Sequence, residues 1–337
     1  MKPQTAIILI NIGSPDSPHI SSVRKYLKEF LTDKRVIEMP ALFRYLLVYG
    51  IIAPFRSPKS AKKYREVWTD SGSPLMVHSQ NLQQDLQDNI GDKSDVYLAM
   101  RYGNPGIKVI LKEIEQKNYD KLVIVPLYPQ YAASTTGTAI DKVMKSVSKW
   151  NRKPEIVKIG AFYNHTAYLS SLAEKVESYQ PAIYDHILIS FHGLPLKQVY
   201  KAHSGETCDD VDCANKINAE NHKCYQAQCY HTARLLTEKL NLIEKQYTVA
   251  FQSRFSKNWL EPFTDNVLEQ LAEQGKKKIL VVCPSFIADC LETLHEIEIE
   301  YKEVFLQKGG EQLTMVPALN SDKYWVKALD DIINDSI

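Results

Sequence analysis

The sequence predicts an α/β protein made of two similar Rossmann-like halves, each a four-stranded parallel sheet flanked by helices. Short apolar runs typical of buried strands recur at 6–11, 96–100, 121–126, 156–160, 186–191, 247–252, 277–282 and 313–317. Helix-length segments separate most of these runs, and strands that alternate with helices form parallel, doubly wound sheets.

An internal duplication supports the two halves. In each half, a strand that ends with an arginine and an aromatic residue is followed by a strand that ends with a proline and an aromatic residue. These pairs are AMRYG (99–103) with VIVPLYPQY (123–131), and QSRFS (252–256) with LVVCPSF (280–286). A chain of 337 residues is also long for a single core. We expect a first half at 1–164, completed by a C-terminal helix at 320–337, and a second half at 165–319. The ligand cleft of such a fold lies between the halves.

Charge and composition narrow the class of protein. With 41 basic and 40 acidic residues the formal net charge is +1, which argues against nucleic acid as a partner. The N-terminal apolar run is too short for a signal peptide, and no uninterrupted apolar stretch is long enough to span a membrane. The six cysteines then indicate a reducing, cytoplasmic location, with free thiols or metal ligands.

Glycine-rich phosphate-binding motifs do not occur in the sequence. Neither G-x-G-x-x-G nor G-x-x-x-x-G-K-[ST] is present, which counts against a nucleotide-dependent enzyme despite the predicted fold. The segment ASTTGT (133–138) is a helix-start signal that can bind an anion only weakly.

Residues 41–56, ALFRYLLVYGIIAPFR, form the most hydrophobic stretch. Arg44, Gly50 and Pro54 interrupt it, so it cannot span a bilayer. Two interpretations stay open: a core helix, or an exposed hydrophobic lip that receives an apolar substrate or touches the inner face of a membrane.

A row of carboxylates follows the seventh strand. Within 277–301 a strand and a Pro-Ser turn lead into a predicted helix on which Glu292, Glu296 and Glu300 share one stripe, with Tyr301 on the far side. A solvated acidic face is one interpretation. However, carboxylates four residues apart repel each other, and the helix begins where open α/β sheets bind ligands. We therefore interpret the row as a path for a cation or for protons.

The segment SFHGLP (190–195) places His192 at the carboxyl end of the fifth strand. A single histidine is more often structural, but one held at a strand tip by a Gly-Leu-Pro turn is a good candidate base or metal ligand.

Polar residues also follow the other strands. Arg101-Tyr102 and Ser253-Arg254 can bind carboxylate groups of a ligand, because arginine pairs bidentately with them. Further polar or flat side chains at the expected cleft rim are Tyr128, Tyr131, Ser134, Thr135 and Trp259. Together these residues describe a large, flat, partly anionic ligand.

These motifs, in this order, resemble the ferrochelatase family, enzymes that insert ferrous iron into a porphyrin as the last step of haem synthesis. The resemblance runs over nearly the whole length, through NIGSPDS (11–17), VRKYLKEFLTDKRVIEMP (23–40), RSPKSAKKY (56–64), GSPL (72–75), AMRYG (99–103), PLYPQYAASTTG (126–137), SFHGLP (190–195), QSRF (252–255), WL (259–260) and DCLETLHEIEIEY (289–301).

The resemblance implies roles for individual residues. His192 matches the family histidine, which either abstracts pyrrole protons or is the first ligand of the iron. Glu292 matches the metal-side glutamate, and Glu296 and Glu300 match the acidic row that relays metal or protons. Porphyrin contacts are expected from Ile12, Arg101, Tyr102, Tyr128, Ser134, Thr135, Ser253, Arg254 and Trp259.

The expected activity is insertion of Fe2+ into protoporphyrin IX. The hydrophobic lip and RSPKSA (56–61) favour this ring over coproporphyrin, which stays as an alternative together with other tetrapyrrole chelatases. A carrier that binds a tetrapyrrole or metal without catalysis is the non-enzymatic alternative. The presence of both His192 and Glu292 argues against it.

The chain departs from the family pattern at two places. His295 stands where relatives commonly have Glu or Tyr, and adds a nitrogen ligand beside the carboxylates. Residues 201–229 form a larger departure that holds Cys208, Cys213, Cys224 and Cys229, spaced C-x4-C-x10-C-x4-C.

Four cysteines in one segment suit a [2Fe–2S] cluster or a structural zinc ion, with unligated thiols as the third possibility. Some ferrochelatases carry a [2Fe–2S] cluster, so the resemblance favours the cluster. Since the segment has few apolar residues, we expect its order to depend on a metal.

Overall fold

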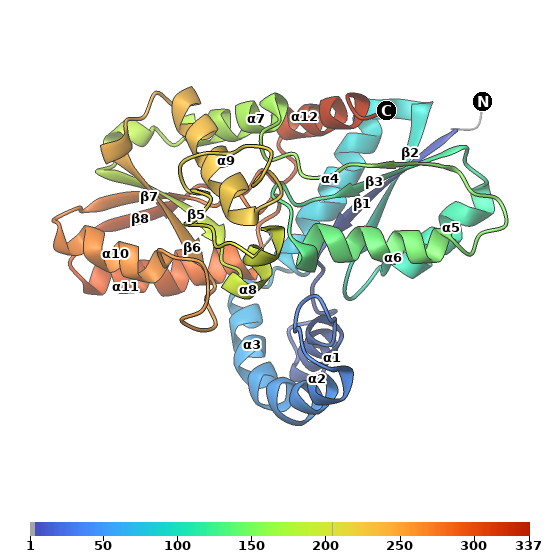
Figure 1. Ribbon diagram of the computed structural model, residues 1–337, viewed down its shortest axis with the longest axis horizontal. Helices are drawn as coiled ribbons and strands as arrows, with labels where there is room; N and C mark the ends of the chain where they lie inside the picture. Colours follow the sequence, from blue (N-terminus) through green and yellow to red (C-terminus); the bar gives the residue numbers. More distant parts are fainter. Residues whose placement is uncertain (1–3, 204) are drawn as a thin grey trace. The chain divides into compact units, whose positions relative to one another are not determined.

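The structure is a computed structural model that describes residues 4–203 and 205–337. Residues 1–3 of the predicted first half and residue 204 of the cysteine-rich segment lie outside the described residues. The chain divides into two compact units (Figure 1). Unit 1 comprises Met1–Tyr128, Ala132–Gly160 and Ser321–Ile337, and unit 2 comprises Pro129–Tyr131 and Ala161–Asn320.

Unit 1 contains a parallel sheet of four strands in the order β2-β1-β3-β4. The strands are β1 (Thr5–Asn11), β2 (Ser94–Met100), β3 (Lys121–Pro126) and β4 (Glu155–Lys158). One face of β1, carrying Ala6, Ile8 and Ile10, packs against α5 (Ile107–Lys117) and α6 (Thr138–Val147) in a single apolar core. Burial on both sides explains why this strand reads as a continuous apolar run.

Unit 2 repeats this arrangement with the order β6-β5-β7-β8. Its strands are β5 (His186–His192), β6 (Tyr247–Gln252), β7 (Lys278–Val282) and β8 (Gln312–Met315). All neighbouring strands are parallel in both sheets. The two identical strand orders confirm the predicted fold class of two similar Rossmann-like halves.

Further helices connect the strands of each unit. In unit 1 these are α4 (Pro74–Ile90), the 3-10 turn η2 (Gly91–Lys93), the π-helix η3 (Ala133–Gly137) and the C-terminal α12 (Lys323–Asn334). In unit 2 they are α7 (Thr166–Glu177), η4 (Pro181–Ile183), α8 (Leu196–Val199), η5 (Tyr200–Ala202), α9 (Tyr225–Lys239), η6 (Glu244–Gln246), α10 (Thr264–Glu273), η7 (Glu292–Tyr301) and α11 (Lys302–Gln307). Helix α12 packs on α4, where Asn89 Nδ2 donates to Asp330 Oδ2 at 2.9 Å.

A helical arm in unit 1 carries the hydrophobic stretch 41–56. It consists of α1 (Ile20–Leu31), α2 (Ala41–Leu47), the π-helix η1 (Val48–Ile52) and α3 (Ala53–Val67), with α1 packed on α3 (Figure 1). Only Arg44, Val48 and Ala53 of this stretch are buried. The most exposed apolar side chains are Leu42 (68%), Phe43 (61%), Leu46 (61%), Ile51 (57%) and Phe55 (75%). The stretch is therefore an exposed lip and not a core helix.

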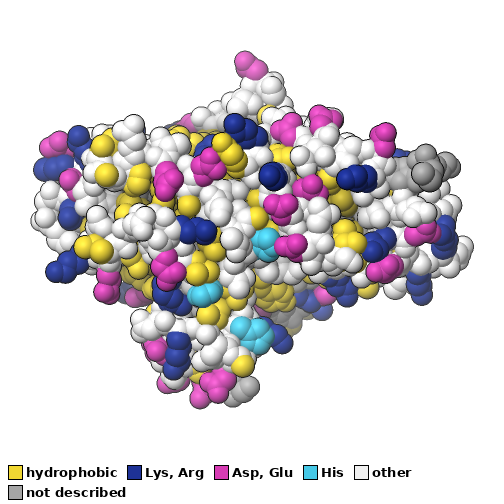
Figure 2. All heavy atoms as spheres, turned by 90° about the horizontal axis from the view of Figure 1, so that it is seen from above, with side chains coloured by type: hydrophobic (Ala, Val, Ile, Leu, Met, Phe, Trp, Pro, Cys, Tyr) yellow, Lys and Arg dark blue, Asp and Glu magenta, His cyan; other side chains and the backbone are white. Residues whose placement is uncertain are grey.

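The surface carries both signs of charge. Figure 2 shows acidic and basic side chains interspersed over the face that it displays, as the net charge of +1 leads one to expect. No helix in the described part of the chain combines the length and apolar character that a membrane crossing requires.

Candidate functional site

His192 is the last residue of β5, and its ring is oriented by its own loop. The Nδ1 atom lies 2.6 Å from the carbonyl oxygen of Gly193. A carbonyl oxygen can only accept a hydrogen bond, so Nδ1 carries the proton and donates it. In the neutral ring this leaves the lone pair on Nε2, the atom available to take up a proton or to bind a metal ion.

The backbone around His192 is tightly packed. The Gly193 N–H donates to the Gln252 carbonyl at 2.8 Å, and a Cβ atom at Gly193 would lie only 2.8 Å from the same oxygen. The hydroxyl of Tyr225, at the start of α9, donates to the His192 carbonyl at 2.8 Å. The imidazole also lies beside the ring of Trp259, with centroids 6.4 Å apart. This strand tip therefore requires glycine and holds the histidine from several sides.

The carboxylate row lies on a π-helix, η7, rather than on the ordinary α-helix that the periodicity predicted. Its hydrogen bonds span five residues, so a π-helix has a wider turn than an α-helix. Tyr301, expected on the side opposite the carboxylates, instead donates its hydroxyl hydrogen to Glu296 Oε1, five residues earlier, at 2.7 Å. The prediction for Tyr301 was wrong because it assumed 3.6 residues per turn. Such π-helical segments frequently occur at functional sites.

Glu296 is held by a clamp from the neighbouring strand tip. The Ser253 N–H donates to Glu296 Oε1 at 2.7 Å, and the Ser253 hydroxyl donates to Oε2 at 2.6 Å. Ser253 follows β6 with a φ of 63°, in the left-handed region that serine seldom adopts, so the clamp is built on an unfavourable backbone conformation.

Burial raises the pKa of Glu296, although the hydrogen bonds from Ser253 and Tyr301 oppose the rise. The charge of His192 also lowers this pKa, and that of Glu292 raises it. The three ionisable groups therefore interact electrostatically within unit 2. A half-buried carboxyl with a raised pKa, within electrostatic range of an imidazole, is suited to exchange protons.

The beginning of η7 is fixed by a buried aspartate. Asp289 Oδ1 accepts hydrogen bonds from the Thr293 hydroxyl at 3.0 Å and from the Ala318 N–H at 3.1 Å, while Oδ2 accepts from Asn320 at 2.8 Å. Gln252 Nε2 donates to the main-chain oxygen of Glu292 at 2.8 Å. The backbone at Glu292 is thereby anchored to β6.

Glu300, the last carboxylate of the row, lies close to His295. Glu300 Oε2 lies 3.6 Å from Nδ1 of His295, which is buried. His295 therefore lies within reach of the row, as its sequence position predicted.

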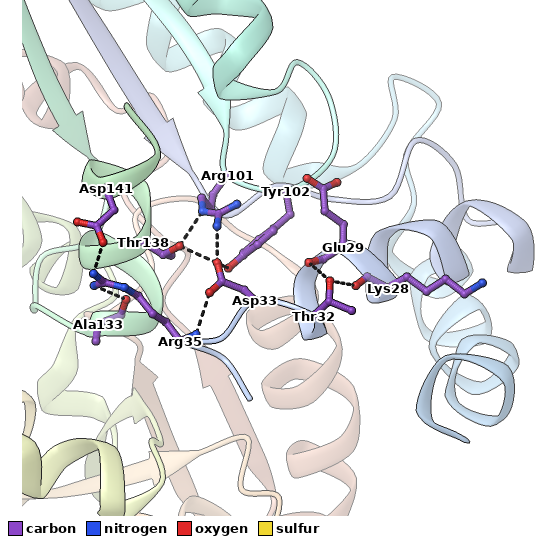
Figure 3. Close-up of polar contacts among 10 residues, drawn as sticks. All are labelled: Lys28, Glu29, Thr32, Asp33, Arg35, Arg101, Tyr102, Ala133, Thr138 and Asp141. Carbon is purple, nitrogen blue, oxygen red and sulfur yellow. Dashed lines mark hydrogen bonds and ion pairs between the residues drawn. The ribbon is translucent and has the colours of Figure 1, made fainter. Parts of the chain in front are cut away.

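In unit 1 the predicted ligand-binding pair Arg101 and Tyr102 belongs to an internal polar network (Figure 3). Arg101 forms an ion pair with Asp33 and donates from Nε to Thr138 Oγ1 at 2.9 Å. The hydroxyl groups of Tyr102 and Thr138 donate to Asp33 Oδ2 at 3.0 and 2.7 Å. The polar groups of both predicted residues are thus paired within unit 1, since Asp33 supplies the carboxylate that sequence reasoning assigned to a ligand.

Arg254, the second arginine predicted to bind a ligand carboxylate, also has a partner within the protein. Arg254 pairs with Asp265, and its guanidinium lies 4.3 Å from the centre of the Phe263 ring. An existing ion pair with an aspartate weakens the case for either arginine as a carboxylate receptor.

The remaining predicted porphyrin contacts lie in unit 1. Ile12 is half-buried directly after β1. Tyr128 is buried after β3, and its hydroxyl has no hydrogen-bond partner within the described part of the chain. Ser134 and Thr135 lie half-buried in η3, where Arg35 binds the carbonyl of Ala133 at 3.5 Å and the carboxylate of Asp141 (Figure 3).

The cysteine-rich segment forms a compact group that differs from the predicted set. Ligand atoms of His203, Cys208, Cys213 and Cys224 all lie within 4.8 Å of one another, and all four residues are buried. Cys229 is not part of this group; it lies buried one helical turn into α9, where burial raises the pKa of its thiol. Of the four cysteines predicted as ligands, three therefore lie together in the described structure, and a histidine completes the group.

Sequence reasoning missed several residues of these sites. Asp33, Thr138 and Tyr225 are far in sequence from the residues they contact, so no local pattern identifies them. His203 carried a usable signal, because it precedes Cys208 by the same five positions that separate Cys208 from Cys213.

The fold is of the chelatase type. The structures of SirB from Bacillus subtilis with Fe3+ and of the sirohydrochlorin chelatase SirB from Bacillus subtilis subspecies spizizenii in complex with cobalt both have a similar fold, each with a TM-score of 0.55. They are 11% and 10% identical to this chain, cover all of it, and are themselves covered to 96% and 95%.

The chain belongs to the ferrochelatase family, whose model matches residues 4–337. A ferrochelatase of Legionella pneumophila strain Paris is 44% identical over 332 residues, which is 98% of this chain and 99% of the relative. A ferrochelatase of Coxiella burnetii strain Dugway 5J108-111 is 40% identical over 337 residues, covering 98% of this chain and 93% of the relative. These similarities confirm the family expected from the motifs.

Proposed function

We propose that this chain inserts Fe2+ into protoporphyrin IX, releasing the two pyrrole protons and forming protohaem. The observation that supports this most directly is the arrangement in unit 2, where the His192 imidazole has its Nε2 lone pair available and its charge lowers the pKa of the Glu296 carboxyl. This combination suits metal insertion, because the imidazole can take up a pyrrole proton while a carboxylate oxygen guides the cation.

In the proposed reaction, Nε2 of His192 accepts a pyrrole proton and the ring becomes an imidazolium ion. The nearby carboxylate of Glu296 stabilises that positive charge, as its electrostatic interaction with His192 indicates. Glu292, with a partly exposed side chain, guides Fe2+ or receives protons. Glu296 and Glu300 continue the proton path along η7. In the opposite assignment His192 is the first iron ligand, and the same Nε2 lone pair serves that role.

The exposed lip of unit 1 supports protoporphyrin as the ring. Apolar side chains such as Leu42 and Phe55 can cover the vinyl and methyl edge of protoporphyrin, and the same lip can touch the surface of a membrane from the cytoplasmic side. A ring with many carboxylates would require cationic side chains, whereas Arg101 and Arg254 are each already paired with an aspartate. Coproporphyrin stays as the alternative substrate.

The ligand arrangement of the cysteine-rich segment does not support the predicted [2Fe–2S] cluster. A two-iron cluster needs four protein ligands in two pairs, each pair on its own iron. The described group is compact and includes His203 in place of Cys229. No catalytic step is assigned to a cluster.

An anaerobic assay with the full chain tests the proposal. Loss of porphyrin fluorescence is followed with Fe2+ and either protoporphyrin IX or coproporphyrin III. We expect turnover with protoporphyrin IX that is abolished by His192→Ala and by Glu292→Gln, while porphyrin binding persists. The exposed residues His19 and Glu303 provide matched controls, and His19→Ala and Glu303→Gln should retain activity.

Each alternative has its own outcome. Porphyrin binding without turnover by the wild-type chain would indicate a carrier, and faster turnover with coproporphyrin III would assign that ring as the substrate. Near-normal turnover of either site variant would remove that residue from the mechanism. If His192→Ala still binds Fe2+ in the absence of porphyrin, whereas Glu292→Gln does not, His192 acts as the base and not as the first iron ligand.

A further inference from the structure

The group formed by His203, Cys208, Cys213 and Cys224 has the dimensions of a mononuclear tetrahedral metal site. Nε2 of His203 lies 3.5 Å from the sulfur atoms of both Cys208 and Cys213, and the sulfurs of Cys208 and Cys224 are 3.6 Å apart. A zinc ion with bonds of about 2.3 Å to sulfur and about 2.0 Å to nitrogen requires edges of roughly 3.8 Å between sulfurs and roughly 3.5 Å between sulfur and nitrogen. The described distances match these edges.

We propose that this segment holds one structural Zn2+ ion, bound by the Nε2 atom of His203 and the thiolates of Cys208, Cys213 and Cys224. Closed sites with three cysteines and one histidine are a standard ligand set for structural zinc. The chain spacing, H-x4-C-x4-C-x10-C, lets a single turn-rich segment wrap around the ion.

A disulfide bond or a two-iron cluster fits the four side chains less well. A disulfide requires sulfurs about 2.05 Å apart, and all six cysteines are free. In a [2Fe–2S] cluster, ligands on different irons lie more than about 5 Å apart, whereas all four ligand atoms here lie within 4.8 Å of one another. Cys229, the fourth cysteine of the segment, lies outside the group.

An ordinary apolar core does not account for the group either. Between residues 205 and 224 the buried apolar residues other than the three cysteines reduce to Val211, and the buried polar residue is Asn221. A segment with so small a core depends on a metal ion or another cross-link for its order. The metal ligands themselves are the interior of this segment.

Neighbouring groups are placed to support thiolate ligands. Nδ2 of the fully buried Asn221 lies 3.6 Å from the Cys213 sulfur, as a donor to a thiolate would. Cys224 is the N-terminal capping residue of α9, a helix of 15 residues, so its thiolate faces the positive end of the helix dipole. These contacts supplement the ligand geometry.

A zinc ion at this position also affects the strand tip that carries His192, because it is linked to that tip through Tyr225. Tyr225 directly follows the ligand Cys224, and its hydroxyl donates to the His192 carbonyl at 2.8 Å and lies 3.2 Å from the hydroxyl of Ser285. By fixing the first turn of α9, the ion fixes Tyr225, which acts as a positioning residue for His192. This link to catalysis rests on the proposed function, whereas the zinc assignment does not.

Elemental analysis of the full chain, purified without chelators, tests the zinc site independently of turnover. We expect about one zinc per chain and no acid-labile sulfide. Cys213→Ser should lower the zinc content to near zero and speed proteolysis within 201–224. Cys229→Ser is the matched control, and it should retain the zinc because Cys229 is also buried but lies outside the group. His203→Cys replaces one ligand type by another and should retain zinc even if Cys213→Ser does not fold.

Other results would overturn the proposal. Two irons and two sulfides per chain that disappear in Cys229→Ser would establish the four-cysteine cluster. A single iron without sulfide would reject zinc, and a metal-free wild-type chain with the segment resistant to proteolysis would reject any metal. For the positioning role, Tyr225→Phe should lower kcat about tenfold while the zinc content is unchanged and the KM for porphyrin stays within about twofold. Unchanged kcat would reject that role alone.

Discussion

Removal of the Tyr301 hydroxyl tests whether hydrogen bonds hold Glu296 as a half-buried carboxylate. The carboxylate accepts one hydrogen bond from Tyr301 at 2.7 Å and two from Ser253 at 2.7 and 2.6 Å. A hydrogen bond to a charged group contributes about 1.5–3 kcal/mol. We therefore expect Tyr301→Phe to lower the free energy of unfolding by about 2 kcal/mol at pH 8, which lowers Tm by about 4–8 °C in a unit of this size.

The pH dependence has a defined sign. Because burial raises the pKa of Glu296 in the folded protein, its contribution to stability is fully present below the unfolded pKa of about 4.3 and is lost as the pH rises through the folded pKa. Glu296→Gln is neutral at every pH. This variant should raise Tm at pH 8 and change it little near pH 4. At the same time it should lose metal insertion, because the proposed mechanism uses this carboxylate to stabilise the imidazolium ion.

A double-mutant cycle by urea unfolding isolates the hydrogen bond. Wild type, Tyr301→Phe, Glu296→Gln and the double variant are compared at pH 8, where we expect a coupling free energy above about 1 kcal/mol. Tyr324→Phe, on an exposed side chain, is the control and should change stability by less than about 0.5 kcal/mol. Additive effects within about 0.5 kcal/mol would refute the reasoning, because independent sites behave in that way.

Three further predictions concern other parts of the chain. Gly193→Ala should lower both Tm and kcat, because its Cβ would lie 2.8 Å from the Gln252 carbonyl oxygen; a circular-dichroism melt and a turnover assay check this, and unchanged values would contradict the close packing. Arg101→Gln should lower the free energy of unfolding in urea by about 3 kcal/mol, since it leaves the Asp33 carboxylate buried without its cation; a loss below about 0.5 kcal/mol would mean that solvent replaces the arginine. Replacing Leu42, Leu46 and Ile51 of the exposed lip with serine should weaken porphyrin binding in a fluorescence titration with little change in Tm. A large drop in Tm would show instead that these side chains belong to the core.

The fold could be predicted because its signals are local. A parallel strand buried on both faces must be apolar throughout, and β1 with Ala6 to Ile10 at most 1% exposed is such a strand. The duplication was visible because equivalent strands end in similar motifs. Helix α6 (Thr138–Val147) begins at the end of ASTTGT (133–138), the segment that the sequence marks as a helix start.

The candidate site could be predicted only in part. His192 carries a local signal, because Gly193 and Pro195 fix a turn directly after a strand. The partner of Arg101 carries no local signal, because Asp33 lies 68 residues away in sequence. From sequence alone, an arginine at a strand tip looks the same whether its carboxylate partner belongs to a ligand or to the chain. The π-helix was missed for a different reason, since apolar periodicity is read with 3.6 residues per turn.

The two units also differ at the position of the proposed base. Met100 and Phe251 are equivalent, because each N–H donates to the carbonyl of a following proline, Pro105 or Pro262. Met100 pairs with Asn11 on β1, and Phe251 pairs with Phe191 on β5. Ile12 follows Asn11 directly after β1, His192 follows Phe191 at the end of β5, and a glycine follows each one.

Both of these glycines are required by close backbone approach, since a Cβ at Gly13 or Gly193 would lie 1.8 or 2.8 Å from a carbonyl oxygen. The duplicated architecture has thus retained the glycine in both units while the residue before it is an imidazole in one and an aliphatic side chain in the other. A base is needed on only one unit if a single group removes the pyrrole protons. An isoleucine at the equivalent tip then fits the proposed contact with an apolar ring, because it offers dispersion contacts and no competing base.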